Sequence, residues 1–202
     1  YMGAPEYWLW IGSISSAVEP LPFFLMILFA FTMARDRKIK HDNEIALTWA
    51  KGTAVMSFIG AGVWGFFHTL APVNMYTHGT QLTAAHGHLS FYGAYVMIVF
   101  TVVSYAMPIL RGRPHGNCKK AQKVELSSFW MMNIGMMGLT LALSAAGIVQ
   151  IMDSRVGTEL LGFMESVESI SGIFTVRAGF GVLVLLGLLT YFYSFFVKEE
   201  VK

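Results

Sequence analysis

Five long apolar segments dominate the pattern of hydrophobic and polar positions. They lie at about residues 7–34, 45–67, 82–110, 125–152 and 170–197. Each exceeds the roughly 20 residues that a helix needs to cross the hydrocarbon core of a bilayer. Because backbone groups in lipid must be hydrogen-bonded within the segment, such segments are expected to be helical. The pattern therefore predicts an all-α integral membrane protein with five transmembrane helices, and residues 1–202 are expected to form one domain.

The charged residues are distributed unevenly between the two ends of these segments. All but two of the 14 Lys and Arg residues lie near the first connection, in the third connection or in the C-terminal tail. The connections at 68–81 and 153–169 contain one basic residue, Arg155. Cytoplasmic loops are enriched in Lys and Arg, so we expect the N-terminus outside the cytoplasm and the C-terminus inside. Because the basic residues occupy short loops between spans, a nucleic-acid partner is not expected.

Composition and the first residues of the chain add three further expectations. Only 13% of the residues are charged, against about a quarter in a soluble domain, which agrees with the lipid bilayer as surroundings. The single cysteine, Cys118, excludes a disulfide within the chain and a cysteine-ligated cluster. The chain opens on Tyr1 without a basic signal-peptide region, which favours a fragment or a processed product.

The triplet His86-Gly87-His88 near the start of the third segment is the most informative motif. A helix turns about 100° per residue, so the two imidazoles leave opposite sides, about 3 Å apart along the axis. They cannot share one metal, but they can bind two separate centres in the outer half of the membrane. Ligating side chains inside a membrane span are rare and usually functional. The alternative is a pair of hydrogen-bonded structural histidines.

Haem is the natural ligand for a lone histidine between apolar helices. Ala84, Ala85 and Gly87 leave room for a macrocycle, although small residues are also ordinary helix packing. None of the other histidines lies deep in a span; these are His41 and His115 on the cytoplasmic side and His68 and His78 on the outer side. A second axial ligand must then come from a neighbouring polypeptide or a missing segment. His78 is interpreted either as a donor to a haem propionate or as a solvated loop residue.

Two glutamates in the first segment are further candidates. Glu19 lies about 18 Å into the span, near the bilayer middle, and Pro20 and Pro22 should break the helix beside it. A broken helix at membrane depth is tolerated where it lines a cavity. In such a cavity Glu19 could deliver protons or lie beside a metal ion. The alternative is a protonated Glu19 bonded to a neighbouring helix. Glu6 is interpreted as a first-turn charge, or less directly as part of a proton entry path.

These motifs resemble the large catalytic subunit of bacterial nitric oxide reductases, within the haem-copper oxidase superfamily. The resemblance is carried by residues 3–6, 18–24, 60–66, 68–74, 76–79, 81–89, 91–95 and 104–108. Residues 191–195 resemble the cytochrome c-dependent branch more than the quinol-dependent one. The family's full subunit has about 12 spans, and the five predicted here resemble its C-terminal part. The chain departs from the family in lacking the upstream spans, so it is expected to be inactive alone.

The resemblance implies specific roles for the candidate residues. His86 would ligate the iron of a high-spin haem b, and His88 that of a low-spin haem b. Glu19 would lie near a non-haem iron, whose ligands are mostly outside this chain, and His78 at the propionates of the catalytic haem. Glu6 would belong to the proton path. Calcium at the propionates is a further candidate.

The implied reaction converts two NO to N2O and water with electrons from cytochrome c. The implied partners are the N-terminal half of the catalytic subunit and a membrane-anchored cytochrome c subunit, in the bacterial inner membrane. Two alternatives stay open. One is an oxygen reductase of the same superfamily with copper as the second metal, which Glu19 disfavours because a hard carboxylate suits iron better than Cu(I). The other is a non-catalytic haem b protein that relays electrons; a redox-inert scaffold is less favoured.

Overall fold

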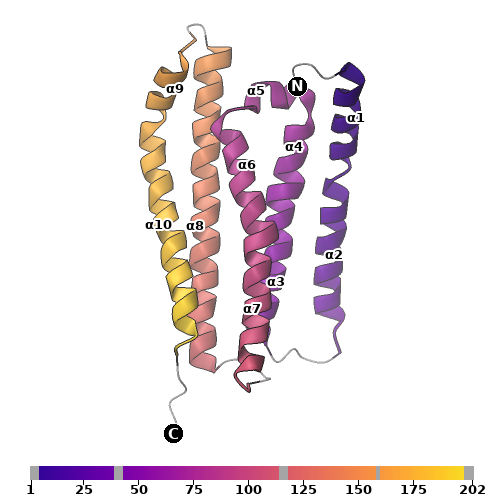
Figure 1. The fold of residues 1–202 in the computed structure, drawn as a ribbon, viewed down its shortest axis with the longest axis vertical. Coiled ribbons are helices and arrows are strands. Elements are labelled where there is room, and N and C mark those ends of the chain that lie inside the picture. The colour runs from indigo at the N-terminus through magenta and orange to yellow at the C-terminus, as the bar shows by residue number, and fades with distance from the viewer. Residues whose placement is uncertain (1–4, 39–42, 114–117, 158–159, 198–202) are drawn as a thin grey trace.

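Long helices running in alternating directions make up the part of the chain that the computed structural model describes, residues 5–38, 43–113, 118–157 and 160–197 (Figure 1). No strand occurs in these ranges. Four helical stretches are long and apolar enough to cross a membrane by themselves: Glu6–Asp36, Gln81–Leu110, Lys119–Val156 and Ser171–Ser194. A fifth, Glu44–Thr69, passes the same test only together with Ala71–Thr77, to which it is bent by 101°. The predicted all-α membrane fold is confirmed, with four spans, or five if the bent pair counts as one.

Several sequence features lie outside the described residues. They are Gly3 and Ala4 of the first motif, the loop histidines His41 and His115, the basic residues Lys40, Lys198 and Lys202, and both chain ends. The single-domain organisation of residues 1–202 stays a prediction.

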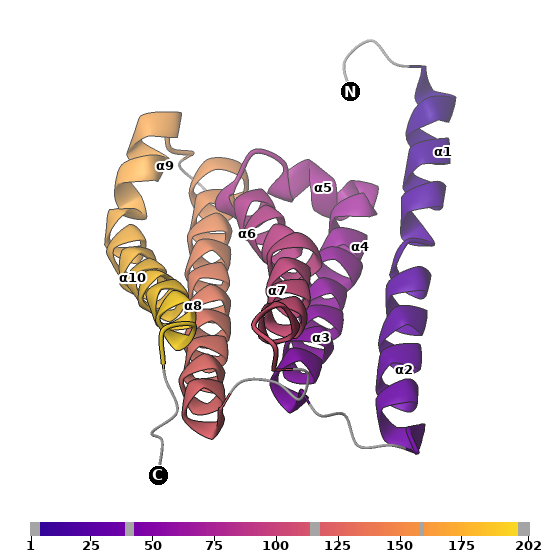
Figure 2. The same cartoon turned by 60° about the horizontal axis from the view of Figure 1, so that its bottom comes forward.

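The first span is interrupted where its prolines predict an interruption. Helix α1 (Glu6–Ala17) ends before Val18, and α2 (Pro20–Asp36) begins two residues later, with Val18 and Glu19 at the junction. The two junction N–H groups of Val18 and Glu19 donate three residues back, at 3.3 and 3.1 Å, which tightens the last turn of α1. Proline at the start of α2 needs no N–H donor there. Figure 2 shows this pair of helices standing at one edge of the bundle.

The second span changes helix type midway. It consists of α3 (Glu44–Ser57), the π-helical segment η1 (Phe58–Trp64) and α4 (Gly65–Thr69). Asn43 caps α3 by accepting a hydrogen bond from the N–H of Ala46 at 3.2 Å. After α4, Leu70 is extended and the short helix α5 (Ala71–Thr77) turns across one end of the bundle, at the top of Figure 1. Pro72 in the first turn of α5 suits a new start rather than a continuation of α4.

The third span is antiparallel to the second and packs closely on it. It consists of α6 (Gln81–Phe91), the π-helical segment η2 (Tyr92–Val96) and α7 (Met97–Leu110). A Cβ on Gly60 would lie 2.7 Å from the carbonyl carbon of Leu89, and one on Gly93 would lie 2.5 Å from that of Met56. Only glycine allows backbones to approach this closely, as is typical of helix contacts in membranes.

The last two long helices lie side by side (Figure 1). Helix α8 (Lys119–Ile151) continues through the π-helical segment η3 (Met152–Val156), and α9 (Phe163–Ser169) leads into α10 (Ser171–Ser194). Glycines again mediate the contact, since Cβ atoms on Gly135 and Gly187 would meet α10 and α8 within 3.0 Å. Helix α8 begins six residues before the predicted apolar segment because Lys119, Lys120 and Lys123 continue the helix beyond the membrane core.

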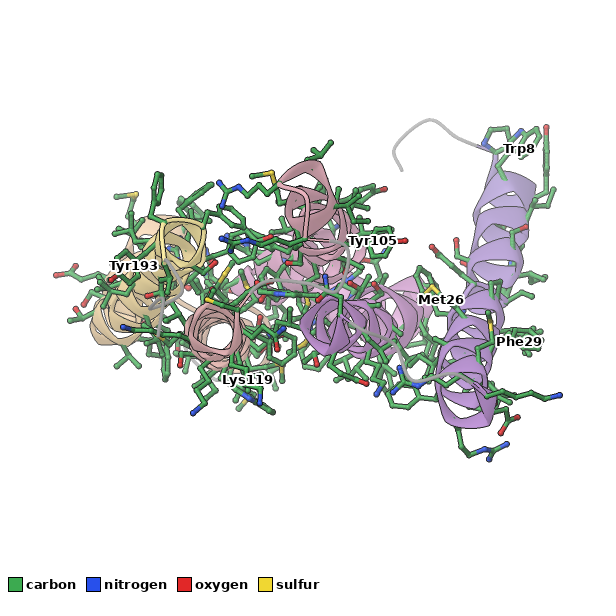
Figure 3. The ribbon with its side chains drawn as sticks, turned by 90° about the horizontal axis from the view of Figure 1, so that it is seen from below. Trp8, Met26, Phe29, Tyr105, Lys119 and Tyr193 are labelled. Atoms are coloured by element: carbon green, nitrogen blue, oxygen red, sulfur yellow. The ribbon has the colours of Figure 1, made fainter. Side chains whose placement is uncertain are left out.

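A cluster of buried aromatic rings lies between α3, α7, α8 and α10. Trp49 is fully buried, and its ring lies 4.9 Å from that of Phe100, 5.0 Å from Phe129 and 5.6 Å from Tyr191. This cluster lies towards the end at which α2, α7 and α10 finish and α3 and α8 start (Figure 1). Figure 3 looks onto that end, where Lys119 lies at the surface. Most of the basic residues in the described ranges therefore gather at this end of the bundle.

Candidate functional site

A cavity of about 920 Å³ lies towards the end of the bundle that α5 crosses, between the α1–α2 junction, α4, α5, α6 and η2. Three of the residues singled out in the sequence line it: Glu19, His78 and His86. Small residues (Ala61, Gly65, Ala71 and Ala94) and aromatic rings (Phe23, Phe91 and Tyr95) make up much of the remaining wall. Such a wall is suited to a large flat apolar ligand with a few polar attachments.

The side chain of His86, a residue of α6, makes its hydrogen bonds through Nδ1. Its Nδ1 lies 3.0 Å from the carbonyl oxygen of Gly60 and 3.1 Å from the hydroxyl of Ser90. Because a carbonyl can only accept, Nδ1 carries the proton and Nε2 keeps its lone pair. Histidines that bind metals usually donate their other nitrogen in this way, which fixes the tautomer. The carbonyl of Gly60 comes within reach because glycine lets η1 and α6 approach, and His86 is thereby prepared to ligate through Nε2.

His68 on α4 also lines the cavity, although the sequence analysis assigned it no role. Its ring stacks on that of His86, with centroids 5.1 Å apart and an angle of 21° between the planes. Its Nδ1 lies 2.9 Å from the carbonyl oxygen of Trp64 on the preceding turn. Its Nε2 is buried and has no hydrogen-bond partner among the described residues. The sequence did contain a signal for this contact. His68 and His86 each lie nine positions from Thr77, and residues equally far from a short connection between two antiparallel helices lie at similar heights in the bundle.

Glu19 lies at the junction between α1 and α2 and faces the cavity with Ser13 and Ser16. These three residues recur at a spacing of three, which places them along one side of the α1 helix. The predicted association of the broken helix with a cavity is thus present in the structure. Glu6 lies in the exposed first turn of α1 and does not line the cavity. About 20 Å of helix separates Glu6 from Glu19.

The outer rim of the cavity is held together by Arg155. Its guanidinium donates hydrogen bonds to the carbonyl oxygens of Met75 (3.0 Å), Tyr76 and His78 (2.7 Å). These carbonyls lie at the C-terminal end of α5, where a cation is favoured by the helix dipole. Arg155 and His78 both line the cavity, so its outer rim is cationic or polar.

His88 lies on the other side of α6, as the helical geometry predicts. It is exposed and does not line the cavity, and its Nδ1 lies 2.8 Å from the carbonyl oxygen of Ala84. Its Nε2 is therefore also available as a ligand atom. A Cβ on the intervening Gly87 would meet no atom within 4 Å. Within the described ranges, no three His, Cys, Asp or Glu side chains gather as the ligands of one metal ion.

Two comparisons with known proteins agree with this arrangement. The family described as cytochrome c and quinol oxidase polypeptide I matches residues 1–183. A nitric oxide reductase subunit of Stutzerimonas stutzeri is 54% identical over 197 residues, which is 96% of this chain. The chain spans 42% of the length of that relative.

Proposed function

Since the chain belongs to the cytochrome c and quinol oxidase polypeptide I family, we propose that it is part of the catalytic subunit of a nitric oxide reductase. The reaction proposed is the reduction of two NO to N2O and water, with electrons from cytochrome c. The observation that carries this proposal is His86, whose Nε2 is left free beside a large, mostly apolar cavity. The similarity to a nitric oxide reductase subunit over almost the whole chain supports it.

The two histidines of the triplet are proposed to hold two haem b groups. The residues around His86 fit such a group, because the cavity wall is mostly apolar and includes small side chains and aromatic rings. His86 would ligate the high-spin haem and His88, on the opposite face, the low-spin haem. When bound, these groups supply an iron that takes up NO and an iron that delivers electrons to it. The chain itself fixes both imidazoles by Nδ1 bonds to the carbonyls of Gly60 and Ala84.

The remaining cavity residues are proposed to handle protons and the polar edge of the haem. Glu19 would deliver protons to the reacting NO, and it would lie near a non-haem iron whose other ligands belong to the upstream part of the subunit. His78, at the outer rim, would donate to a haem propionate, where calcium is also a candidate. Glu6 is proposed to belong to the proton entry path. It lies 13 positions before Glu19 in the chain and does not line the cavity.

The whole assembly is proposed to contain two more protein parts. These are the N-terminal half of the catalytic subunit and a membrane-anchored cytochrome c subunit. The bundle would lie in the bacterial inner membrane with its basic end in the cytoplasm, so that the cavity opens towards the periplasmic half.

The decisive experiment compares H86A and H88A in the full-length subunit with its cytochrome c partner. Optical and EPR spectra of the reduced complex are recorded with and without NO. We expect H86A to lose the high-spin haem that binds NO and to keep the low-spin signal, and H88A to show the reverse. If the wild type contains two low-spin haems and neither binds NO, the proposal is overturned in favour of a non-catalytic haem b protein that relays electrons.

Metal analysis of the same complex distinguishes the proposed nitric oxide reductase from an oxygen reductase of the same superfamily. One iron in excess of the haem content is expected for a reductase with a non-haem iron. Copper in place of that iron would identify an oxygen reductase instead.

A further inference from the structure

The contact between His68 and His86 has no role in the function proposed above. The two rings lie nearly parallel, 5.1 Å between centroids, although they come from different helices. His68 is itself fixed, because its Nδ1 bonds to the carbonyl of Trp64 on its own helix. It therefore presents a rigid flat surface, rather than a mobile side chain, to the ring of His86.

The hydrogen bonds of His86 do not by themselves fix the plane of its imidazole ring. The Nδ1 contacts with Gly60 and Ser90 fix the tautomer and leave Nε2 as the free nitrogen. They restrain the torsion about the Cβ–Cγ bond only loosely, because a carbonyl accepts over a broad range of angles. A flat neighbour stacked on one face does oppose that torsion. Gly65 also lies near the ring, since a Cβ there would be 3.3 Å from Cε1 of His86, but glycine supplies no flat surface.

We propose that His68 is a positioning residue that fixes the ring plane of His86 through the stacked contact. This inference rests on the proposed function, in which His86 ligates a haem iron through Nε2. The plane of an axial imidazole sets how its orbitals meet the iron, so supports behind the ligand tune the metal. The restraint on the ring plane of His86 comes from the flat face of the His68 ring and not from its nitrogen atoms. Its Nδ1 is used within its own helix, and its Nε2 contacts no described hydrogen-bonding group.

The test uses resonance Raman spectroscopy of the ferrous holoenzyme, full-length subunit and cytochrome c partner included. The stretching mode between the haem iron and its axial histidine reports the bond to His86 directly. Three variants separate the possible causes. H68F keeps a flat ring without nitrogens, H68L keeps the volume without a ring, and H68A removes both.

We expect H68F to keep the wild-type frequency and width, and H68L and H68A to show a downshifted and broadened band. Their haem content should equal that of the wild type, because the variants leave the Nδ1 contacts of His86 in place. An unchanged band in H68L and H68A would overturn the inference, and so would a band in H68F that matches H68A. Absence of the iron–histidine mode in the wild type would instead overturn the proposed function, which keeps the two failures distinguishable.

Discussion

The carboxyl of Glu125 is fully buried in the aromatic cluster at the basic end of the bundle. Its Oε1 accepts hydrogen bonds from the indole N–H of Trp49 at 3.2 Å and from the hydroxyl of Ser104. Ser104 in turn lies 2.9 Å from the hydroxyl of Tyr191. Four helices, α3, α7, α8 and α10, are thereby connected through Oε1 of Glu125 and the hydroxyl of Ser104. The ion pairs among the described residues, Arg35–Asp36 and Arg37–Glu44, do not include Glu125.

Glutamine is expected to replace Glu125 with little loss of stability. In E125Q the amide carbonyl can accept both hydrogen bonds that Oε1 accepts now. In E125A the indole N–H of Trp49 is left buried without an acceptor, which costs about 1–3 kcal/mol, whereas Ser104 can donate to the hydroxyl of Tyr191 instead. Thermal unfolding of the purified complex in detergent should therefore place E125A well below E125Q. S127A, an exposed change on the same helix, is the control and should match the wild type. Equal stability of E125A and E125Q would show that these bonds contribute nothing.

At the scale of elements, the packing of the second span against the third decides the position of the cavity. Gly60 and Gly93 lie at the two places where the backbones meet, one in η1 and one in η2. Both segments are π-helical, and the wider turn shifts the faces of the helices that carry it. This close packing brings the carbonyl of Gly60 to His86 and the His68 ring beside it.

An alanine at Gly93 is expected to separate these two spans. Its methyl group would lie 2.5 Å from the backbone of Met56, which cannot move as a side chain can. Overpacking of this kind costs about 1–3 kcal/mol. G93A should lower the melting temperature and reduce haem content, both measured on the purified complex. In contrast, G179A in α10 meets no atom within 4 Å and should be neutral or slightly stabilising, because alanine favours helix. Equal behaviour of the two variants would show that the close approach is not needed.

Arg155 is expected to hold the outer rim in place. Loss of its hydrogen bonds to the carbonyls of Met75, Tyr76 and His78 in R155A should allow the C-terminal end of α5 to open more easily. Loss of about 1.4 kcal/mol of local stability corresponds to roughly tenfold faster amide hydrogen exchange at His78 and Thr80. R177A removes another arginine, whose described contact is the ring of Phe174, and should leave these amides unchanged. Unchanged exchange in R155A would contradict this role.

The sequence predicts the spans well and the cavity only in part, for physical reasons that differ from residue to residue. Hydropathy locates the helices because a bilayer imposes one length and one composition on them. Pro20 and Pro22 predict the break beside Glu19 because proline removes backbone donors. The π-helical segments are not predictable in this way, since they depend on tertiary packing. His68 was missed for the same reason, because its partner is set by the register between two helices rather than by local pattern.

At the scale of the whole molecule, the first span differs from the others in its surroundings. Side chains such as Trp10, Phe29 and Met33 are 60% exposed or more, and none of the residues of α2 is buried. Figure 3 shows Phe29 on this separate pair of helices at the edge of the bundle. Exposed apolar surface of this extent is expected to contact lipid or further protein in the membrane. That expectation agrees with a chain that spans 42% of its relative.

The orientation of the bundle is open to direct measurement. Most of the described basic residues lie at one end, and the cavity rim formed by His78 and Arg155 lies at the other (Figure 1). If the basic end is cytoplasmic, an exposed cysteine at Leu160 should react with an impermeant maleimide in intact spheroplasts. A cysteine at Lys123, exposed at the basic end, should react only after lysis.

Both cysteine variants are made in the full-length subunit in a C118S background, so that Cys118 does not contribute. C118S alone is the control, and its labelling is subtracted because it does not come from the introduced cysteines. Labelling of K123C in intact spheroplasts would place the basic end in the periplasm. A haem held by His86, as proposed, would then face the wrong compartment for electrons from the proposed periplasmic cytochrome c. The same result would therefore argue against the direction of electron and proton entry, whatever the identity of the haem ligands.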